Sequence, residues 1–349
     1  MHVMRIVPLS VCVSAAALLL ASAPALAIGG GGTKGGSDGK GNIAASATQS
    51  RIVVKQKSGA TDGEKGNLAP VDTNWEPPVC WYEPVFSPGQ LKAFVDKTDG
   101  HGDVGIHESW YGKGLWTDHY KDGKASSNLD DEWSKAPGYK NYNIGKDGYF
   151  WRSVAPDDSH PDSWDCGRIM FWQNAGEVPD VPHAPTPKTL AGYAYDKIRV
   201  PDTEVELNPE TKSTVNLPTW VWLDKGTFKN VKVRAELPNT GLWAETTAKP
   251  VSLNLDPGTE DAKLHPASGQ CKINDDGSIG TPYTKGKAKE APPCGITYLR
   301  ASDEPYKLNA SVTWEISWEG SGGASGDLPD GTFETDKDMT VQEVQAINR

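Results

Sequence analysis

Apolar and polar residues alternate strictly in one segment towards the end of the chain. The apolar positions are Val312, Trp314, Ile316 and Trp318, and the polar ones are Thr313, Glu315, Ser317 and Glu319. A period of two predicts a strand over residues 308–319 with one buried face and one wet face. Two indoles on one face need an opposing layer to cover them, so the pattern predicts a two-layered β domain.

The same period recurs from Val200 onward. The apolar positions are Val205 and Leu207, Trp220 and Trp222, then Val231, Val233, Ala235 and Leu237, then Val251, Leu253 and Leu255. Turn residues separate these groups, including Pro238–Gly241 and Asp256–Gly258. Several short strands joined by such turns predict an antiparallel, immunoglobulin-like β-sandwich over residues 199–349.

Residues 72–198 have a different character. Eight of the 13 tryptophans lie there, among many prolines and glycines and with little regular periodicity. Helices are expected at Ser87–Val95 and Thr186–Ile198, since each begins with a capping hydroxyl followed by proline. We therefore predict a Trp-rich, loop-rich α+β domain for this segment. Because the β-sandwich follows it, the whole chain is expected to be mainly β.

The N-terminal region predicts export. Met1–Ala27 combines Arg5, a short apolar run and the small-residue ending Ala25-Leu26-Ala27, which is typical of a secretory signal peptide. A membrane anchor is the alternative, but the run is short and Pro24 breaks it. Residues 28–71 are glycine-rich and predict a disordered linker. The expected location is secreted, extracellular or loosely cell-wall associated, with no membrane insertion after cleavage.

Loss of the signal peptide would remove Cys12 and leave four cysteines, Cys80, Cys166, Cys271 and Cys294. An even number in an oxidising compartment predicts two disulfides, for which three connectivities exist. Cys80 with Cys166 and Cys271 with Cys294 is favoured, because each pair then falls inside one predicted domain. A zinc site built on C-x-x-C is excluded by the spacing.

Charge and motifs narrow the function classes. The formal net charge is −11, which disfavours nucleic acid or anionic lipid as a partner. Leu237–Gly241 matches the L-P-x-T-G sorting signal, but it joins two strand patterns, where a hairpin turn explains it. Gly280–Lys287 misses the P-loop spacing, and no G-x-S-x-G is present. No catalytic residue and no cofactor is predicted.

Histidines gather in the Trp-rich domain. They are His101, His107, His119, His160 and His183, with Asp99 and Asp103 nearby. Imidazole and carboxylate suit zinc, and Asp157-Asp158 or Asn274–Asp276 suit calcium. No H-E-x-x-H is present, and histidines at such spacing are more often surface or packing residues, so no metal site is predicted.

Several segments of residues 184–349 together resemble a group of secreted actinobacterial proteins of unknown function. They are Ala184–Pro187, Val215–Leu223, Cys294–Tyr298, Trp314–Trp318 and Val341–Ala346. In that group the sandwich is similar to polycystic-kidney-disease-type, immunoglobulin-like domains, whose W-x-x-G-D-G turn and H-x-Y strand opening stand here as Leu253–Gly258 and Gly295–Tyr298. The resemblance implies an extracellular module for spacing or binding and carries over no catalytic residue.

The tryptophan density supplies the remaining functional clue. Exposed rings at Trp110, Tyr111, Trp116 and Trp151 could stack on sugar faces or grip a protein. The alternative is that a loop-rich domain needs these rings as its core. We therefore expect a secreted, non-catalytic binding or structural protein of the cell envelope that recognises a glycan or protein partner. The rival hypothesis is a secreted hydrolase of polysaccharide or peptide, with its site in the Trp-rich domain.

Overall fold

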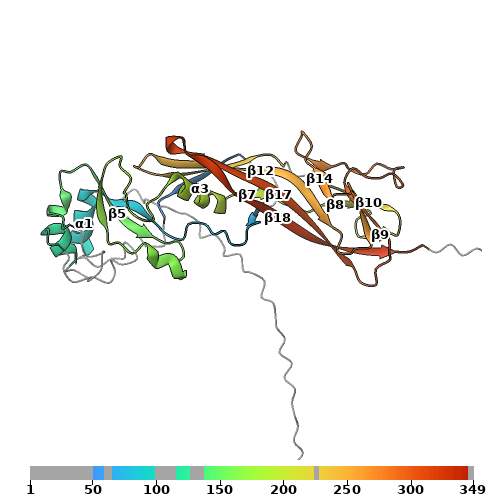
Figure 1. Cartoon of the computed structure of the whole chain (residues 1–349), viewed down its shortest axis with the longest axis horizontal. Coiled ribbons are helices and arrows are strands. Elements are labelled where there is room, and N and C mark those ends of the chain that lie inside the picture. Colours follow the sequence, from blue (N-terminus) through green and yellow to red (C-terminus); the bar gives the residue numbers. More distant parts are fainter. Residues whose placement is uncertain (1–49, 59–64, 99–114, 126–136, 224–227, 345–349) are drawn as a thin grey trace, which may run out of the picture. The chain divides into compact units, whose positions relative to one another are not determined.

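A computed structural model describes residues 50–58, 65–98, 115–125, 137–223 and 228–344. The fold is mainly β, with several antiparallel sheets and few helices (Figure 1). The largest sheet has eight strands, with the order β1-β11-β12-β17-β18-β3, and β14 and β9 pair with β12 and β18. Its strands are β1 Val53–Ser58, β3 Ala69–Pro70, β9 Lys212–Thr214, β11 Val231–Leu237, β12 Leu242–Asp256, β14 Gln270–Lys272, β17 Tyr306–Gly320 and β18 Ser325–Gln342.

A second sheet of five strands has the order β13-β16-β10-β15, with β8 paired to β10. Its strands are β8 Glu206–Asn208, β10 Pro218–Leu223, β13 Ala262–His265, β15 Ile279–Gly280 and β16 Gly295–Tyr298. Apolar residues of both sheets, among them Val221 and Ile296 from the second and Leu253 and Val312 from the first, belong to one buried cluster. The two sheets are thus the layers of the predicted C-terminal sandwich.

Strand β17 has the register that the alternation of its residues predicts. In β17 every second side chain from Leu308 to Trp318 is buried, while Glu315, Ser317 and Glu319 are exposed. The Trp314 ring is fully buried, with its centroid 6.3 Å from that of Phe228. The predicted buried face of this strand is confirmed.

Two other strands, β12 of the large sheet and β10 of the second sheet, depart from their predicted faces. Pro250 pairs with Trp314 and Ser252 with Thr313, so Val251 is left unpaired in a bulge and is 40% exposed. A bulge of this kind reverses the alternation, which explains why Val251 does not share the face of Leu253. In β10, Val221 and not Trp222 belongs to the core cluster, so the prediction from the tryptophans chose the wrong face.

Helix α3, Pro187–Asp196, covers part of the large sheet that the second sheet does not cover (Figure 1). Thr186 caps it through a reciprocal capping box with Thr189, as its hydroxyl predicted. The Thr246 hydroxyl of β12 donates to the Ala191 carbonyl oxygen at 3.0 Å. One long sheet therefore has two covering layers, a helix and a sheet.

A smaller sheet carries the Trp-rich region. It consists of β4 Trp81–Phe86, β5 Gly148–Val154 and β6 Phe171–Asn174, in the order β4-β5-β6. The remaining elements are β2 Lys65–Asn67 paired with β7 Arg199–Pro201, and the helical segments α1 Pro88–Thr98, η2 Leu115–Lys121, η4 Asn141–Asn143, η5 Pro161–Asp165 and η6 Ser321–Gly323. Ser87 caps α1, because its hydroxyl accepts the backbone N–H of Gln90 at 3.4 Å.

Part of the predicted linker is folded. β1 pairs with β11 from Val53 to Ser58, and Ala69 and Pro70 pair with β18. The prediction of a disordered linker over residues 28–71 therefore does not hold for β1 and β3. Trp81 and Trp151 also share the buried cluster of the sandwich, so the core is continuous across residue 198.

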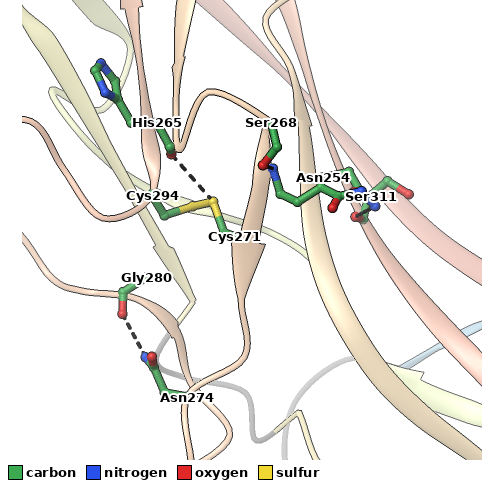
Figure 2. Close-up of a disulfide and its surroundings, with 9 residues drawn as sticks. Asn254, His265, Ser268, Cys271, Asn274, Gly280, Cys294 and Ser311 are labelled. Carbon is green, nitrogen blue, oxygen red and sulfur yellow. Dashed lines mark hydrogen bonds between the residues drawn. A yellow bond between two sulfur atoms is a disulfide. The ribbon is translucent and has the colours of Figure 1, made fainter.

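Both predicted disulfides are confirmed. Cys80 bonds to Cys166, with the two Cα atoms 6.0 Å apart, and Cys271 bonds to Cys294, with the Cα atoms 5.4 Å apart. Figure 2 shows the second bond, which ties β14 of the large sheet to the residue preceding β16 of the second sheet. Within the part of the chain that the structure describes, no helix is long and apolar enough to cross a membrane.

Candidate functional site

Of the four aromatic residues expected to bind a ligand, the structure describes two, and both are buried. Trp116 and Trp151 are 0% and 2% exposed, so neither ring offers a free face. The prediction of an exposed aromatic platform is therefore wrong for these two residues. Their rings lie in the hydrophobic core, where a loop-rich region needs large apolar side chains. Trp110 and Tyr111 lie outside the described residues.

Trp116 belongs to a second buried cluster, separate from that of the sandwich, which we call the aromatic cluster. Its members are Val85, Phe86, Leu91, Val95, Trp116, Tyr120, Tyr139, Tyr142, Phe150, Ile169 and Met170. The rings contact one another in sequence: Trp116 stacks on Tyr120 at 5.4 Å between centroids, and Tyr120 stacks on Tyr139 at 5.7 Å. Such contacts give this region a core despite its scarcity of regular structure.

Two rare backbone conformations border the aromatic cluster. η2 is a π-helical turn, in which the N–H of Asp122 donates to the carbonyl oxygen of Thr117 at 2.9 Å. η4 contains three consecutive residues in the left-handed region, Asn141, Tyr142 and Asn143, with φ of 47°, 55° and 56°. Asparagine tolerates this region, whereas tyrosine adopts it at a cost in free energy. Both conformations are found preferentially at functional sites.

Among the residues that the structure describes, three buried polar atoms beside these turns have no hydrogen-bond partner. They are Trp116 Nε1, His119 Nε2 and Asn143 Nδ2. A buried polar atom without a partner costs about 1–3 kcal/mol. Strained backbone and unpaired polar atoms therefore occur together at the aromatic cluster, which makes this region the candidate binding site.

His119 is the titratable group of this site. It is 1% exposed, its Nδ1 lies 3.3 Å from the carbonyl oxygen of Lys124, and its ring meets those of Tyr120 and Tyr139 edge to face. Burial lowers the pKa of His119 below its usual value. The imidazole is accordingly neutral at pH 7. Because the Lys124 carbonyl oxygen can only accept, Nδ1 carries the proton and Nε2 is a hydrogen-bond acceptor.

A second polar centre lies in the small sheet. Glu83 of β4 is fully buried, and its carboxylate accepts hydrogen bonds from the Ser50 hydroxyl at 2.5 Å, the Arg51 N–H at 2.6 Å and the Trp81 indole N–H at 2.7 Å. The side chain of Arg51 also donates to the Pro84 carbonyl oxygen at 3.4 Å. Glu83 thus fastens residues 50 and 51 to the small sheet. Sequence reasoning missed this role, because one glutamate among 46 acidic residues carries no distinguishing signal.

The structure separates the histidines that the sequence grouped. His119 lies in the aromatic cluster, while His160 caps η5 by accepting the N–H of Asp162. His183 lies beside the Cys80–Cys166 disulfide, and this is the single group of three metal-ligand residues within ligand distance among the described residues. His101 and His107 lie outside those residues.

The acidic segments considered for calcium have local roles. Asp157 accepts hydrogen bonds from the backbone and hydroxyl of Ser159, and Asp276 does the same for Ser278. These contacts are Asx turns, which need no ion.

Comparison of the chain with protein-family models, with curated proteins and with solved structures finds no match. The resemblance to secreted actinobacterial proteins therefore stays a hypothesis. Any functional argument rests on the geometry of this chain.

Proposed function

We propose that this chain is an exported, non-catalytic binding or structural protein of the cell envelope. The observation that carries the proposal is the use of Glu83 and Glu245, the two carboxylate residues that are buried in the described part of the chain. Three donors occupy Glu83, and two lysines, Lys57 and Lys232, contact Glu245 at 2.6 and 3.0 Å. Both side chains are engaged in holding strands together.

A hydrolase needs different carboxylates. A general acid that works near neutral pH has a raised pKa, and it faces a second carboxylate across the substrate. Hydrogen bonds lower the pKa of the carboxyl groups of Asp157, Glu245 and Asp276, which is the opposite of the shift that a general acid needs. These groups support an architectural role and not acid catalysis.

The binding part of the proposal rests on the aromatic cluster. The strained turn η4 is a cost to the free protein, and its first residue, Asn141, is exposed, so contacts with a partner at this turn could offset that cost. Ile144, directly after η4, is 46% exposed and places an apolar side chain on the surface at this point. We assign the contact with a glycan or protein partner to this surface.

The test is retention of purified protein on separated envelope fractions, namely peptidoglycan, soluble polysaccharide and envelope proteins. Ile144→Asp should weaken retention at least tenfold without lowering the melting temperature, since it opens no core. Leu299→Asp is the matched control, because Leu299 is 39% exposed on the sandwich and should retain full binding. Failure of every fraction to retain the wild type, or equal retention of both variants, contradicts the assignment.

A further inference from the structure

His183 lies at a position of a turn where glycine or asparagine is normally found. The backbone N–H of Ala184 donates to the carbonyl oxygen of Val181 at 3.0 Å, which closes a four-residue turn around Pro182 and His183. His183 has a φ of 60°. Proline followed by a residue with positive φ is the pattern of a type II turn, in which glycine or asparagine normally takes the second central position. A histidine held there bears strain that glycine would not.

The turn brings the imidazole of His183 to the Cys80–Cys166 disulfide. One ring nitrogen of His183 and the two sulfur atoms all lie within 4.8 Å of one another. His183 is exposed and Cys80 is 7% exposed, whereas Cys166 is fully buried. The group is therefore reachable from solvent on the side of His183 and Cys80.

The other disulfide provides a contrast inside the same molecule. His265 also lies beside Cys271–Cys294, but it approaches with its backbone carbonyl oxygen, 3.9 Å from the Cys271 sulfur. Its imidazole points away from the bond (Figure 2) and lies 2.9 Å from the Thr297 hydroxyl. A histidine beside a cystine therefore need not direct its ring at the sulfur atoms, as His265 shows. At Cys80–Cys166 the strained turn places the ring of His183 near both sulfur atoms.

We propose that Cys80, Cys166 and His183 form a zinc site when this disulfide is reduced. A dithiol reductant transfers two electrons to the cystine, giving two thiols and the oxidised reductant. Zn²⁺ then displaces one proton from each thiol and takes up the neutral imidazole nitrogen. Two thiolates and one imidazole suit zinc, and water completes the four ligands.

The site forms by a local rearrangement of three side chains. Zn–S bonds of about 2.3 Å and a Zn–N bond of about 2.0 Å, at tetrahedral angles, put the ligand atoms about 3.5–3.8 Å apart. The two sulfur atoms, bonded at about 2 Å in the cystine, therefore have to part by about 1.8 Å once the bond is reduced. The ring nitrogen of His183 lies within 4.8 Å of both sulfur atoms, so an approach of about 1 Å by this exposed side chain completes the site. Oxidation would reform the cystine and release the metal, which couples zinc binding to the redox state.

The test uses the full exported chain, reduced with a dithiol, freed of reductant under nitrogen and titrated with Co²⁺. Cobalt reports thiolate ligands through charge-transfer absorption, and competition with Zn²⁺ gives the zinc affinity. We expect one Co²⁺ per reduced chain and none per oxidised chain. In His183→Gly the affinity should fall at least tenfold, while the melting temperature of the oxidised protein stays equal or rises, because the turn is relieved.

The variant with alanine at both Cys80 and Cys166 retains the other cysteine pair and should take up no cobalt after reduction. The proposal is overturned by any of three results. The first is that the reduced wild type takes up no cobalt, whether or not it stays folded. The second is that His183→Gly binds cobalt as tightly as the wild type. The third is that the double alanine variant takes up cobalt.

Discussion

Replacing Trp314 by alanine should lower the stability of the sandwich and the Trp-rich region together. The indole is fully buried between the layers, against Phe228. Truncation of a buried tryptophan costs roughly 3–5 kcal/mol, because a cavity remains. A domain has about 5–15 kcal/mol of stability in total, so the loss is a large fraction. Trp314→Phe should cost about 1–2 kcal/mol, since Nε1 has no partner to lose.

The matched control is the next residue. The Glu315 side chain is 55% exposed and pairs with Lys249 at 3.3 Å, so Glu315→Ala should cost no more than about 1 kcal/mol. Urea denaturation followed by far-ultraviolet circular dichroism measures these differences. Equal losses for Trp314→Ala and Glu315→Ala would show that the register of β17 is wrong.

Hydrogen exchange of the same variants tests the continuity of the core. Trp81 and Trp151 share the buried cluster with Trp314, so amides of β4 and β5 should lose protection along with those of β17. Unchanged protection in β4 and β5 would instead restore the boundary near residue 198 that the sequence predicted.

Three further predictions concern single groups. Glu83→Gln should lower the free energy of unfolding by about 2–3 kcal/mol, because an amide cannot accept hydrogen bonds from all three donors. The control Glu76→Gln, on a side chain that is 65% exposed, should change the free energy of unfolding by less than about 0.5 kcal/mol. Equal losses for the two variants would contradict the role of Glu83. The lowered pKa of His119 means that the unfolded chain binds more protons just below about pH 6.5, so stability should fall as the pH decreases from 7 to 5.5. Thermal melts of His119→Phe should show a shallower dependence on pH, and an unchanged slope would refute this. Alanine at both Cys271 and Cys294 should lower the free energy of unfolding by about 3 kcal/mol, the loop-closure entropy expected for a sequence separation of 23. Alanine at both Cys80 and Cys166, with a separation of 86, should lower it by about 1 kcal/mol more. The reverse order of losses in urea denaturation would contradict this entropic explanation.

The sequence predicted those elements whose residues face two different environments. Trp314 and Trp318 alternate with glutamates, and Thr186-Pro187 marks a helix start, so both features could be read directly. β18 could not be predicted from its own residues, since its charged segment from Glu334 to Asp338 lacks an apolar face. Pairing with β17 defines that strand, and pairing depends on residues that are distant in sequence.

The candidate site was predicted only in part. Tryptophan density pointed to the region that contains the aromatic cluster, but whether a ring is exposed depends on packing, and Trp116 is core. Asparagine at positions 141 and 143 is compatible with a positive φ, but the residue type of Tyr142 does not predict one, and the approach of His183 to Cys80–Cys166 depends on the folded chain. Spacing along the sequence carries no information about such contacts.

The central claim, that this protein binds or supports but does not cleave, is tested most directly by product release. Purified protein would be incubated with envelope polysaccharide and peptide, and new reducing ends and new amino groups would be counted over time. We expect no release above that of buffer alone, while the same material retains the protein. Sustained release that a single carboxylate substitution abolishes, with the fold intact, would contradict it.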